Sequence, residues 1–123
     1  MMNNFYDIII IGAGPGGLFS ALNLPKELKT LIIEKNNSVG KKLLMSGSGR
    51  CNFTHYGDIE GFFLHYGDKS NFVKPSLRGF TNTNLIENVK KHKVEIVIDK
   101  NRKVFPESQK AKDILNCLIK DCS

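Results

Sequence analysis

Gly12-Ala13-Gly14-Pro15-Gly16-Gly17 is the stretch of sequence that decides the fold of this chain. It directly follows the nearly unbroken apolar run Phe5 to Ile11, which ends in a series of isoleucines. A short β-branched run of this kind predicts a parallel strand that is covered on both faces. The glycine spacing matches G-x-G-x-x-G, which joins such a strand to a helix and binds the phosphates of a dinucleotide.

Each position of this turn has a physical role in dinucleotide binding. Gly12 lets the chain leave the strand sharply, Gly14 removes a side chain where the pyrophosphate approaches, and Gly17 lets the helix pack closely. Pro15 lies in the first helical turn, where its missing N–H costs little. The amino terminus of the helix, which includes Gly16, then offers backbone N–H groups and a partial positive charge to the phosphates.

The sequence beyond the turn completes a strand, helix, strand unit within residues 7–35. Apolar residues after the turn keep helical spacing, and Thr30 to Glu34 reads as a second buried strand. Glu34, with Lys35 beside it, stands where a carboxylate accepts hydrogen bonds from ribose hydroxyls. A lone G-x-G-x-x-G is usually an ordinary glycine-rich turn, but here its whole context predicts an adenine-dinucleotide site. FAD and NAD share this fingerprint, so residues 7–35 leave the choice between them open.

A second glycine-rich segment, residues 40–55, follows the predicted second strand. It reads GKKLLMSGSGRCNFTH and has no clear periodicity, which predicts an irregular, functional loop. Its glycines permit close backbone approach, while Ser46, Asn52 and Thr54 offer hydrogen bonds to a cofactor. The alternative is a flexible surface loop.

Residues 40–54 resemble the run G-[KR]-K-[LI]-L-x-S-G-x-G-R-C-N-x-T of the BaiN-like NAD(P)/FAD-dependent oxidoreductases, also called the aminoacetone-oxidase family of FAD-binding proteins. Residues 103–111, KVFPESQKA, resemble the F-P-x-S-x-K-A segment of the same family. The resemblance implies FAD as the cofactor, with its pyrophosphate on the first glycine turn, its adenosine ribose on Glu34 and its flavin near the second loop. It places the second-loop contacts on Lys42, Ser46, Gly47, Arg50, Asn52 and Thr54.

Members of that family are much longer than 123 residues. The resemblance therefore implies that residues 1–123 are the amino-terminal part of an FAD-binding domain, with the substrate domain and the carboxy-terminal part absent. The expected fold class is α/β: an incomplete Rossmann-like βαβ unit, an irregular loop region and a further helix, strand and helix. Because two strands and one crossover are too few to bury both faces of a sheet, we expect a truncated or split gene product.

The rest of the chain predicts fewer regular elements. Residues 53–80 are aromatic and lack clear periodicity, so we expect an irregular segment. Asn84, with Glu87 three residues later, predicts the start of a helix that runs to about residue 93. Residues 94–98 alternate like a strand, and Ser108 can cap a final helix whose apolar positions recur every three or four residues. Those positions are Ala111, Ile114, Leu115, Leu118 and Cys122.

Composition indicates one small domain, with 41% apolar and 24% charged residues. The net charge is +6, but the lysines are dispersed and no aromatic ladder runs between them, so we expect no nucleic-acid partner. Neither a membrane-spanning run nor a signal peptide is evident, which predicts a cytoplasmic protein without a membrane partner. The scattered cysteines and histidines predict neither a disulfide framework nor a metal site. Cys51, in the second loop, is either a packed residue or a redox partner of the flavin.

The favoured function is that of an FAD-dependent oxidoreductase, reduced by NAD(P)H or by a small-molecule substrate that the sequence does not identify. No catalytic acid or base can be named, which suits flavin chemistry because the cofactor carries the electrons. Whether this chain is catalytic by itself stays open. The alternatives are a non-catalytic dinucleotide-binding module and the NAD-binding domain of a dehydrogenase, and the second loop argues against the latter.

Overall fold

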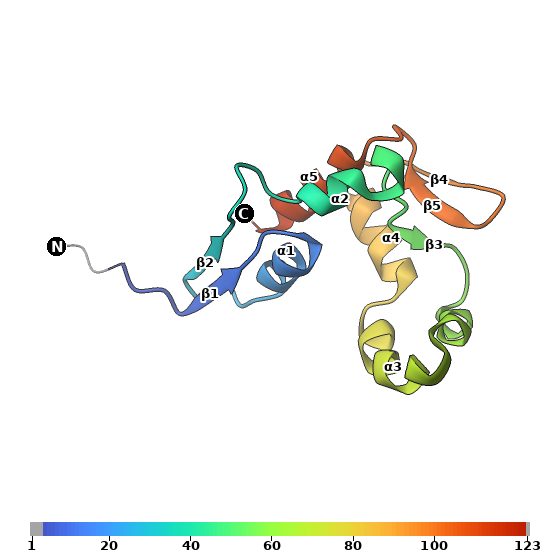
Figure 1. The fold of residues 1–123 in the computed structure, drawn as a ribbon, viewed down its shortest axis with the longest axis horizontal. Helices are drawn as coiled ribbons and strands as arrows, with labels where there is room; N and C mark the ends of the chain where they lie inside the picture. The colour runs from blue at the N-terminus through green and yellow to red at the C-terminus, as the bar shows by residue number, and fades with distance from the viewer. Residues whose placement is uncertain (1–3, 123) are drawn as a thin grey trace.

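The computed structural model describes residues 4–122 and has a mixed α/β fold with a Rossmann-like unit at its amino end. Strand β1 (Ile8–Ile11), helix α1 (Pro15–Leu22) and strand β2 (Thr30–Ile33) follow one another along the chain. The two strands are parallel and pair along their whole length, with α1 as the crossover between them (Figure 1). The predicted βαβ unit is therefore confirmed.

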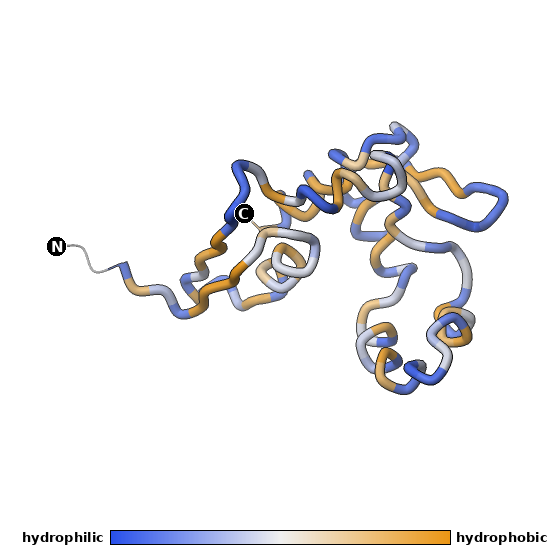
Figure 2. The backbone as a smooth tube through the Cα atoms, viewed as in Figure 1, coloured by the Kyte–Doolittle hydropathy of each residue, from blue (hydrophilic) through white to orange (hydrophobic). Residues whose placement is uncertain are grey.

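The prediction that β1 is covered on both faces is wrong for this chain. Ile9 and Ile11 are 56% and 86% exposed, whereas Ile8 and Ile10 are half-buried. Gly17 of α1 lies against the side chain of Ile10, so the helix covers that face of the sheet. Because this sheet has two strands, its other face stays open within residues 4–122, and Figure 2 shows the apolar β1 at the margin of the molecule.

The segment predicted as an irregular loop forms two short helices instead. Helix α2 (Lys41–Met45) and the 3-10 helix η1 (Ser46–Gly49) follow β2. Gly40, directly before α2, has a left-handed φ of 70°, and Gly47 and Ser48 have φ values of 56° and 58°. These left-handed residues divide the segment into turns too short to give the sequence a visible period.

A second sheet has the antiparallel order β3-β5-β4. Its strands are β3 (Thr54–His55), β4 (Ile96–Ile98) and β5 (Lys103–Pro106). β4 lies within the predicted strand 94–98, whereas β5 has no counterpart among the elements predicted from the sequence. Pro106 at the end of β5 lacks a backbone N–H, which makes its sequence look unlike a paired strand.

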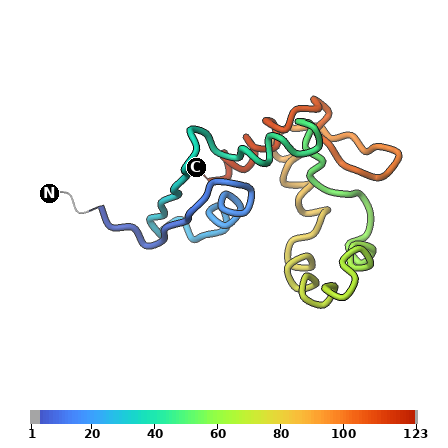
Figure 3. The backbone as a smooth tube through the Cα atoms, viewed as in Figure 1, coloured from blue at the N-terminus to red at the C-terminus, as the bar shows by residue number. Residues whose placement is uncertain are grey.

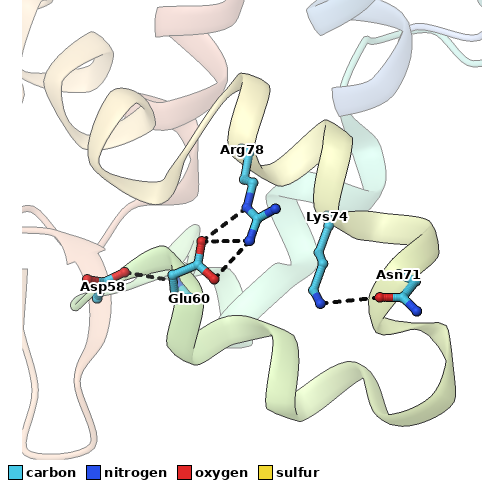
Figure 4. Close-up of polar contacts among 5 residues, drawn as sticks. All are labelled: Asp58, Glu60, Asn71, Lys74 and Arg78. Carbon is cyan, nitrogen blue, oxygen red and sulfur yellow. Dashed lines mark hydrogen bonds and ion pairs between the residues drawn. The ribbon is translucent and has the colours of Figure 1, made fainter.

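Residues 53–80 are mostly helical, so the prediction of an irregular segment is wrong. The 3-10 helix η2 (Ile59–Lys69) leads directly into α3 (Ser70–Gly79), which contains Pro75. Phe63 of η2 is buried, with Lys74 and Arg78 of α3 over its ring at 5.4 Å and 5.1 Å from the centroid. Arg78 also pairs with Glu60 of η2, with Nε to Oε1 and Nη2 to Oε2 both 3.0 Å, which ties the two helices together (Figure 4).

Two further helices complete the chain, α4 (Asn82–Lys91) and α5 (Ala111–Cys122). α4 begins earlier than predicted, because Thr81 is its N-cap residue and Asn84 is the third residue of a capping box. The stripe predicted for α5 is confirmed for Ala111 and most of its other members, which are buried. Among residues 4–122, no helix has the length and apolar character needed to cross a membrane.

The hydrophobic core gathers around α5. This helix packs against α1 and α2, so the carboxy-terminal end of the chain lies beside its amino-terminal βαβ unit (Figure 3). His92, the C-cap residue of α4, contacts Asp121 of α5 with Nε2 to Oδ1 at 2.8 Å, which adds a polar link to this packing. The buried core residues are Ala13, Leu18, Leu43, Cys51, Val89, Ala111, Ile114, Leu115, Cys117 and Leu118.

Candidate dinucleotide site

The glycine turn has the geometry that its sequence predicts. Gly12 has a φ of +103°, and its N–H donates to the carbonyl oxygen of Ile33 at 2.7 Å. A Cβ on Gly17 would lie 2.0 Å from the carbonyl oxygen of Gly12, so this position needs a glycine. Gly14 is the N-cap residue of α1, and no side chain caps the helix there. A Cβ on Gly14 would meet nothing within 4 Å, so its neighbourhood is open to a ligand.

Glu34 holds its carboxylate against this turn. Oε2 accepts a hydrogen bond from the Ala13 N–H at 2.8 Å, and Oε1 accepts from the Asn36 N–H and Nδ2, both at 3.0 Å. The Asn36 N–H and then the Ala13 N–H lower the pKa of Glu34 below its ordinary value, because they stabilise the charged form. The carboxylate is therefore fixed and ionised at neutral pH.

A pocket of about 520 Å³ lies between the glycine turn and α2. It brings together five of the residues predicted from the sequence: Gly12, Gly14, Glu34, Lys35 and Lys42. Its other lining residues are Ile11, Ile33, Asn36, Gly40, Lys41 and Met45, of which Gly40, Lys41 and Met45 belong to the second glycine-rich segment that the sequence predicts as a functional loop. Three lysines and the open amino terminus of α1 give this pocket positive charge, which favours an anionic ligand.

The other predicted residues do not line this pocket. Pro15 is the first residue of α1, and Gly16 and Gly17 follow it in the first helical turn. Ser46 Oγ donates to the carbonyl oxygen of Leu43 at 2.6 Å and so closes the end of α2. Arg50 packs over the Phe105 ring, with its guanidinium carbon 4.8 Å from the ring centroid.

The segment after η1 is held close to the second sheet. Thr54 pairs with Val104 of β5. A Cβ on Gly47 would come 2.8 Å from the backbone nitrogen of Asn52, so the chain passes tightly there. The Oδ1 atom of Asn52 is buried without a hydrogen-bond partner in the described structure. A buried acceptor of this kind costs stability unless a ligand donates to it, so Asn52 can serve a bound group.

Cys51 is a packed residue in this structure. Its side chain is buried in the hydrophobic core, and its N–H donates to the carbonyl oxygen of Ser46 at 3.0 Å. Burial raises the pKa of its thiol, which disfavours the reactive thiolate. The packing interpretation is thus favoured over the redox one. Within residues 4–122, no group of three histidine, cysteine or acidic side chains is placed to hold a metal ion.

A second hollow, of about 710 Å³, was not predicted from the sequence. It lies where the end of β3, the start of η2 and the turn between β4 and β5 meet, and it includes Tyr56, Tyr66 and Arg102. It shares no lining residue with the pocket at the glycine turn. The sequence has no recognisable spacing for this hollow, because its aromatic residues and Arg102 come together from three separate segments.

Comparison with known proteins finds one family model that matches nearly the whole chain. The family model described as HI0933-like protein Rossmann domain matches residues 6–123. The ribosomal RNA dihydrouridine synthase of Escherichia coli strain K12 is 36% identical over 118 residues, covering 95% of this chain and 29% of the relative. The enzyme of the same name from Haemophilus influenzae is 40% identical over 87 residues, covering 69% of this chain and 21% of the relative.

Another relative matches about half of this chain. The soluble pyridine nucleotide transhydrogenase of Vibrio vulnificus strain YJ016 is 44% identical over 64 residues, covering 51% of this chain and 12% of the relative. The chain thus spans less than a third of the length of these curated relatives. Because the first two are named for ribosomal RNA, the expectation of no nucleic-acid partner lacks support from these comparisons.

Proposed function

Because this chain belongs to the HI0933-like Rossmann-domain family, we propose that it binds FAD as part of an NAD(P)/FAD-dependent oxidoreductase of the BaiN-like type. The pocket of about 520 Å³ carries this proposal. It joins an open glycine turn and a fixed carboxylate, the two features that bind the pyrophosphate and the ribose of a dinucleotide, and its three lysines add positive charge.

The pyrophosphate fits the glycine turn. No acidic residue lies in the first turn of α1, and open space surrounds the Cα of Gly14. Backbone N–H groups at the start of α1 would donate to phosphate oxygens, and Lys42 would add positive charge. Glu34 Oε2 would accept a hydrogen bond from a ribose hydroxyl, because it accepts one bond from the Ala13 N–H and keeps its second lone pair, whereas Oε1 already accepts two bonds from Asn36.

The flavin end of the cofactor is assigned to the segment from Ser46 to Thr54. The buried Oδ1 of Asn52 supports this assignment, since it lacks a donor. When bound, FAD supplies the hydride and electron transfer, with NAD(P)H as the proposed reductant. The residues of this chain bind and orient the cofactor, and we assign no acid or base among them. The alternative is a dinucleotide-binding module without catalysis.

A second candidate concerns the substrate. The 36% identity over 95% of the chain to a ribosomal RNA dihydrouridine synthase favours a uridine base in RNA as the group that is reduced. Saturating the C5=C6 bond of uracil takes two electrons and two protons, which a flavin reduced by NAD(P)H can supply together with solvent.

Titration with FAD and with ADP tests the cofactor assignment, because ADP has the adenosine and pyrophosphate but no flavin. Glu34→Ala should weaken the binding of both ligands, whereas Asn52→Ala should weaken that of FAD alone. Circular dichroism of each variant serves as the control for folding. If both substitutions leave the dissociation constant for FAD unchanged, the FAD assignment is wrong.

A further inference from the structure

The hollow between β3, η2 and the β4–β5 turn has the properties of a second ligand site. The backbone at its rim is held in place by the buried side chain of Asn82, which belongs to α4. Asn82 Nδ2 donates to the carbonyl oxygens of His55 and Gly57, at 2.9 Å and 2.7 Å. The Tyr56 N–H donates to the carbonyl oxygen of Arg102 at 2.8 Å, which joins the rim to the β4–β5 turn.

Arg102 brings a positive charge to this hollow. Its guanidinium carbon lies 5.8 Å from the centroid of the Tyr56 ring. Gly57 makes room for it, since a Cβ there would come 3.3 Å from Arg102 Nη2. Among the described residues, no carboxylate forms an ion pair with Arg102. The guanidinium is therefore free to bind an anion, and its planar donors suit a phosphate.

Aromatic rings supply the rest of the lining. Tyr56 and Tyr66 are 53% and 41% exposed, and His65 is exposed beside them. Phe62 and His55 meet edge to face, with ring centroids 6.5 Å apart, which fixes the wall of the hollow. Exposed rings beside an unpaired guanidinium are the components with which proteins stack a nucleobase and hold its phosphate.

Asp58 is the one carboxylate among the residues that line this hollow. Its Oδ1 accepts a hydrogen bond from the Glu60 N–H at 2.9 Å and so caps η2 (Figure 4). Glu60, in turn, pairs with Arg78 of α3. Asp58 thus directs one carboxylate oxygen to the helix start, and Arg102 is the one arginine or lysine among the residues that line the hollow.

We propose that this hollow is a second nucleotide-binding site, in which a base stacks on Tyr56 and Tyr66 and a phosphate binds Arg102. It is separate from the pocket at the glycine turn and does not rest on FAD binding there. A nucleotide of a single-stranded RNA and the adenosine phosphate of a nicotinamide dinucleotide share this chemistry.

Fluorescence anisotropy of the 123-residue chain with a labelled single-stranded RNA hexamer tests the site, with unlabelled NADPH titrated separately by calorimetry. Arg102→Ala should weaken binding of the ligand by roughly tenfold, and Tyr56→Ala by at least about fivefold. Lys100→Ala is the matched control, because it removes one positive charge from the same turn outside the hollow and should change binding less than about twofold.

The two probes distinguish the sources of the nucleotide. Binding of RNA that responds to Arg102→Ala identifies an RNA site, and the same response for NADPH alone identifies a dinucleotide site. The proposal is overturned if neither probe binds saturably, or if Lys100→Ala weakens binding as much as Arg102→Ala. FAD binding should be unchanged in Arg102→Ala. Titration with FAD therefore tests the FAD proposal separately from the second site.

Discussion

Gly17 and Glu34 fix the glycine turn in opposite ways, one by lacking a side chain and the other through the contacts of its side chain. A Cβ at position 17 would overlap the carbonyl oxygen of Gly12, so α1 can lie against β1 only with glycine there. The carboxylate of Glu34 ties the end of β2 to Ala13. The spacing of the fingerprint predicted both residues. It could not predict the hydrogen bonds of Glu34, because these depend on the backbone path after β2.

Gly17→Ala should therefore lower the free energy of unfolding by at least about 2 kcal/mol, because backbone atoms must shift to admit the methyl group. Gly16→Ala is the matched control, since open space surrounds that position, and it should change stability by less than about 1 kcal/mol. Urea denaturation of both variants measures the difference. Equal stability of the two variants would contradict the packing found at Gly17.

Glu34 should also give stability a dependence on pH. Its pKa is lowered in the folded chain, so it contributes stability above its ordinary value of 4.5, and this contribution is lost as the pH falls below that value. Between pH 7 and a pH below 4.5, the Glu34→Gln variant should lose less stability than the unchanged chain, because it lacks the carboxylate with the lowered pKa. Chemical denaturation at the two pH values provides the measurement, and identical losses would show that the carboxylate contacts do not form.

The elements that the sequence predicted well are those with a continuous local signal. The βαβ unit and α5 have unbroken apolar patterns, and the structure contains both. The pair η2 and α3 was missed because Gly67, with a φ of 55° and a ψ of −127°, and Pro75 interrupt the helical period. Phe63 and the exposed Arg78 to Glu60 pair join the two helices, and these are contacts between elements rather than properties of either segment.

The capping box of α4 gives a test at this scale. Thr81 Oγ1 accepts from the Asn84 N–H at 3.2 Å, and Asn84 Oδ1 accepts from the Thr81 N–H at 2.9 Å. Thr81→Ala should reduce the free energy of unfolding by about 1 kcal/mol, because the helix loses an acceptor at its start. Thr83→Ala, at an exposed position within the helix, should have little effect. Thermal melts compare the two, and a larger effect at position 83 would rule out Thr81 as the cap.

At the scale of the whole molecule, α5 joins the first and last parts of the chain. It packs on α1 and α2, and its Leu115 side chain lies against Gly40, where a Cβ would come 2.4 Å from Leu115 Cδ1. The dinucleotide pocket includes Gly40, so packing of α5 supports the wall of the site. The sequence predicted the apolar stripe of α5 but not its partners, because long-range packing is not encoded in the spacing of one helix.

Leu115→Ala should lower the free energy of unfolding by about 2–5 kcal/mol, because it leaves a cavity in the core. Leu64→Ala removes the same atoms from a side chain that is 87% exposed, and it should be nearly neutral. Urea denaturation separates the two variants. A neutral Leu115→Ala would mean that α5 does not form the core of the chain.

The central claim is that the glycine turn of this chain binds FAD. Calorimetric titration with FAD of the unchanged chain and of the Gly14→Val variant tests this claim most directly. Gly14 has a φ of −82°, and a Cβ there would meet nothing within 4 Å, so we expect the fold to admit valine while its side chain blocks the approach of the pyrophosphate. Gly79→Val, in equally open space on α3, is the control. We expect saturable binding of one FAD to the unchanged chain and the control, and loss of binding in Gly14→Val without loss of folding. Failure of the unchanged chain to bind FAD, or unaltered binding by Gly14→Val, would contradict the account.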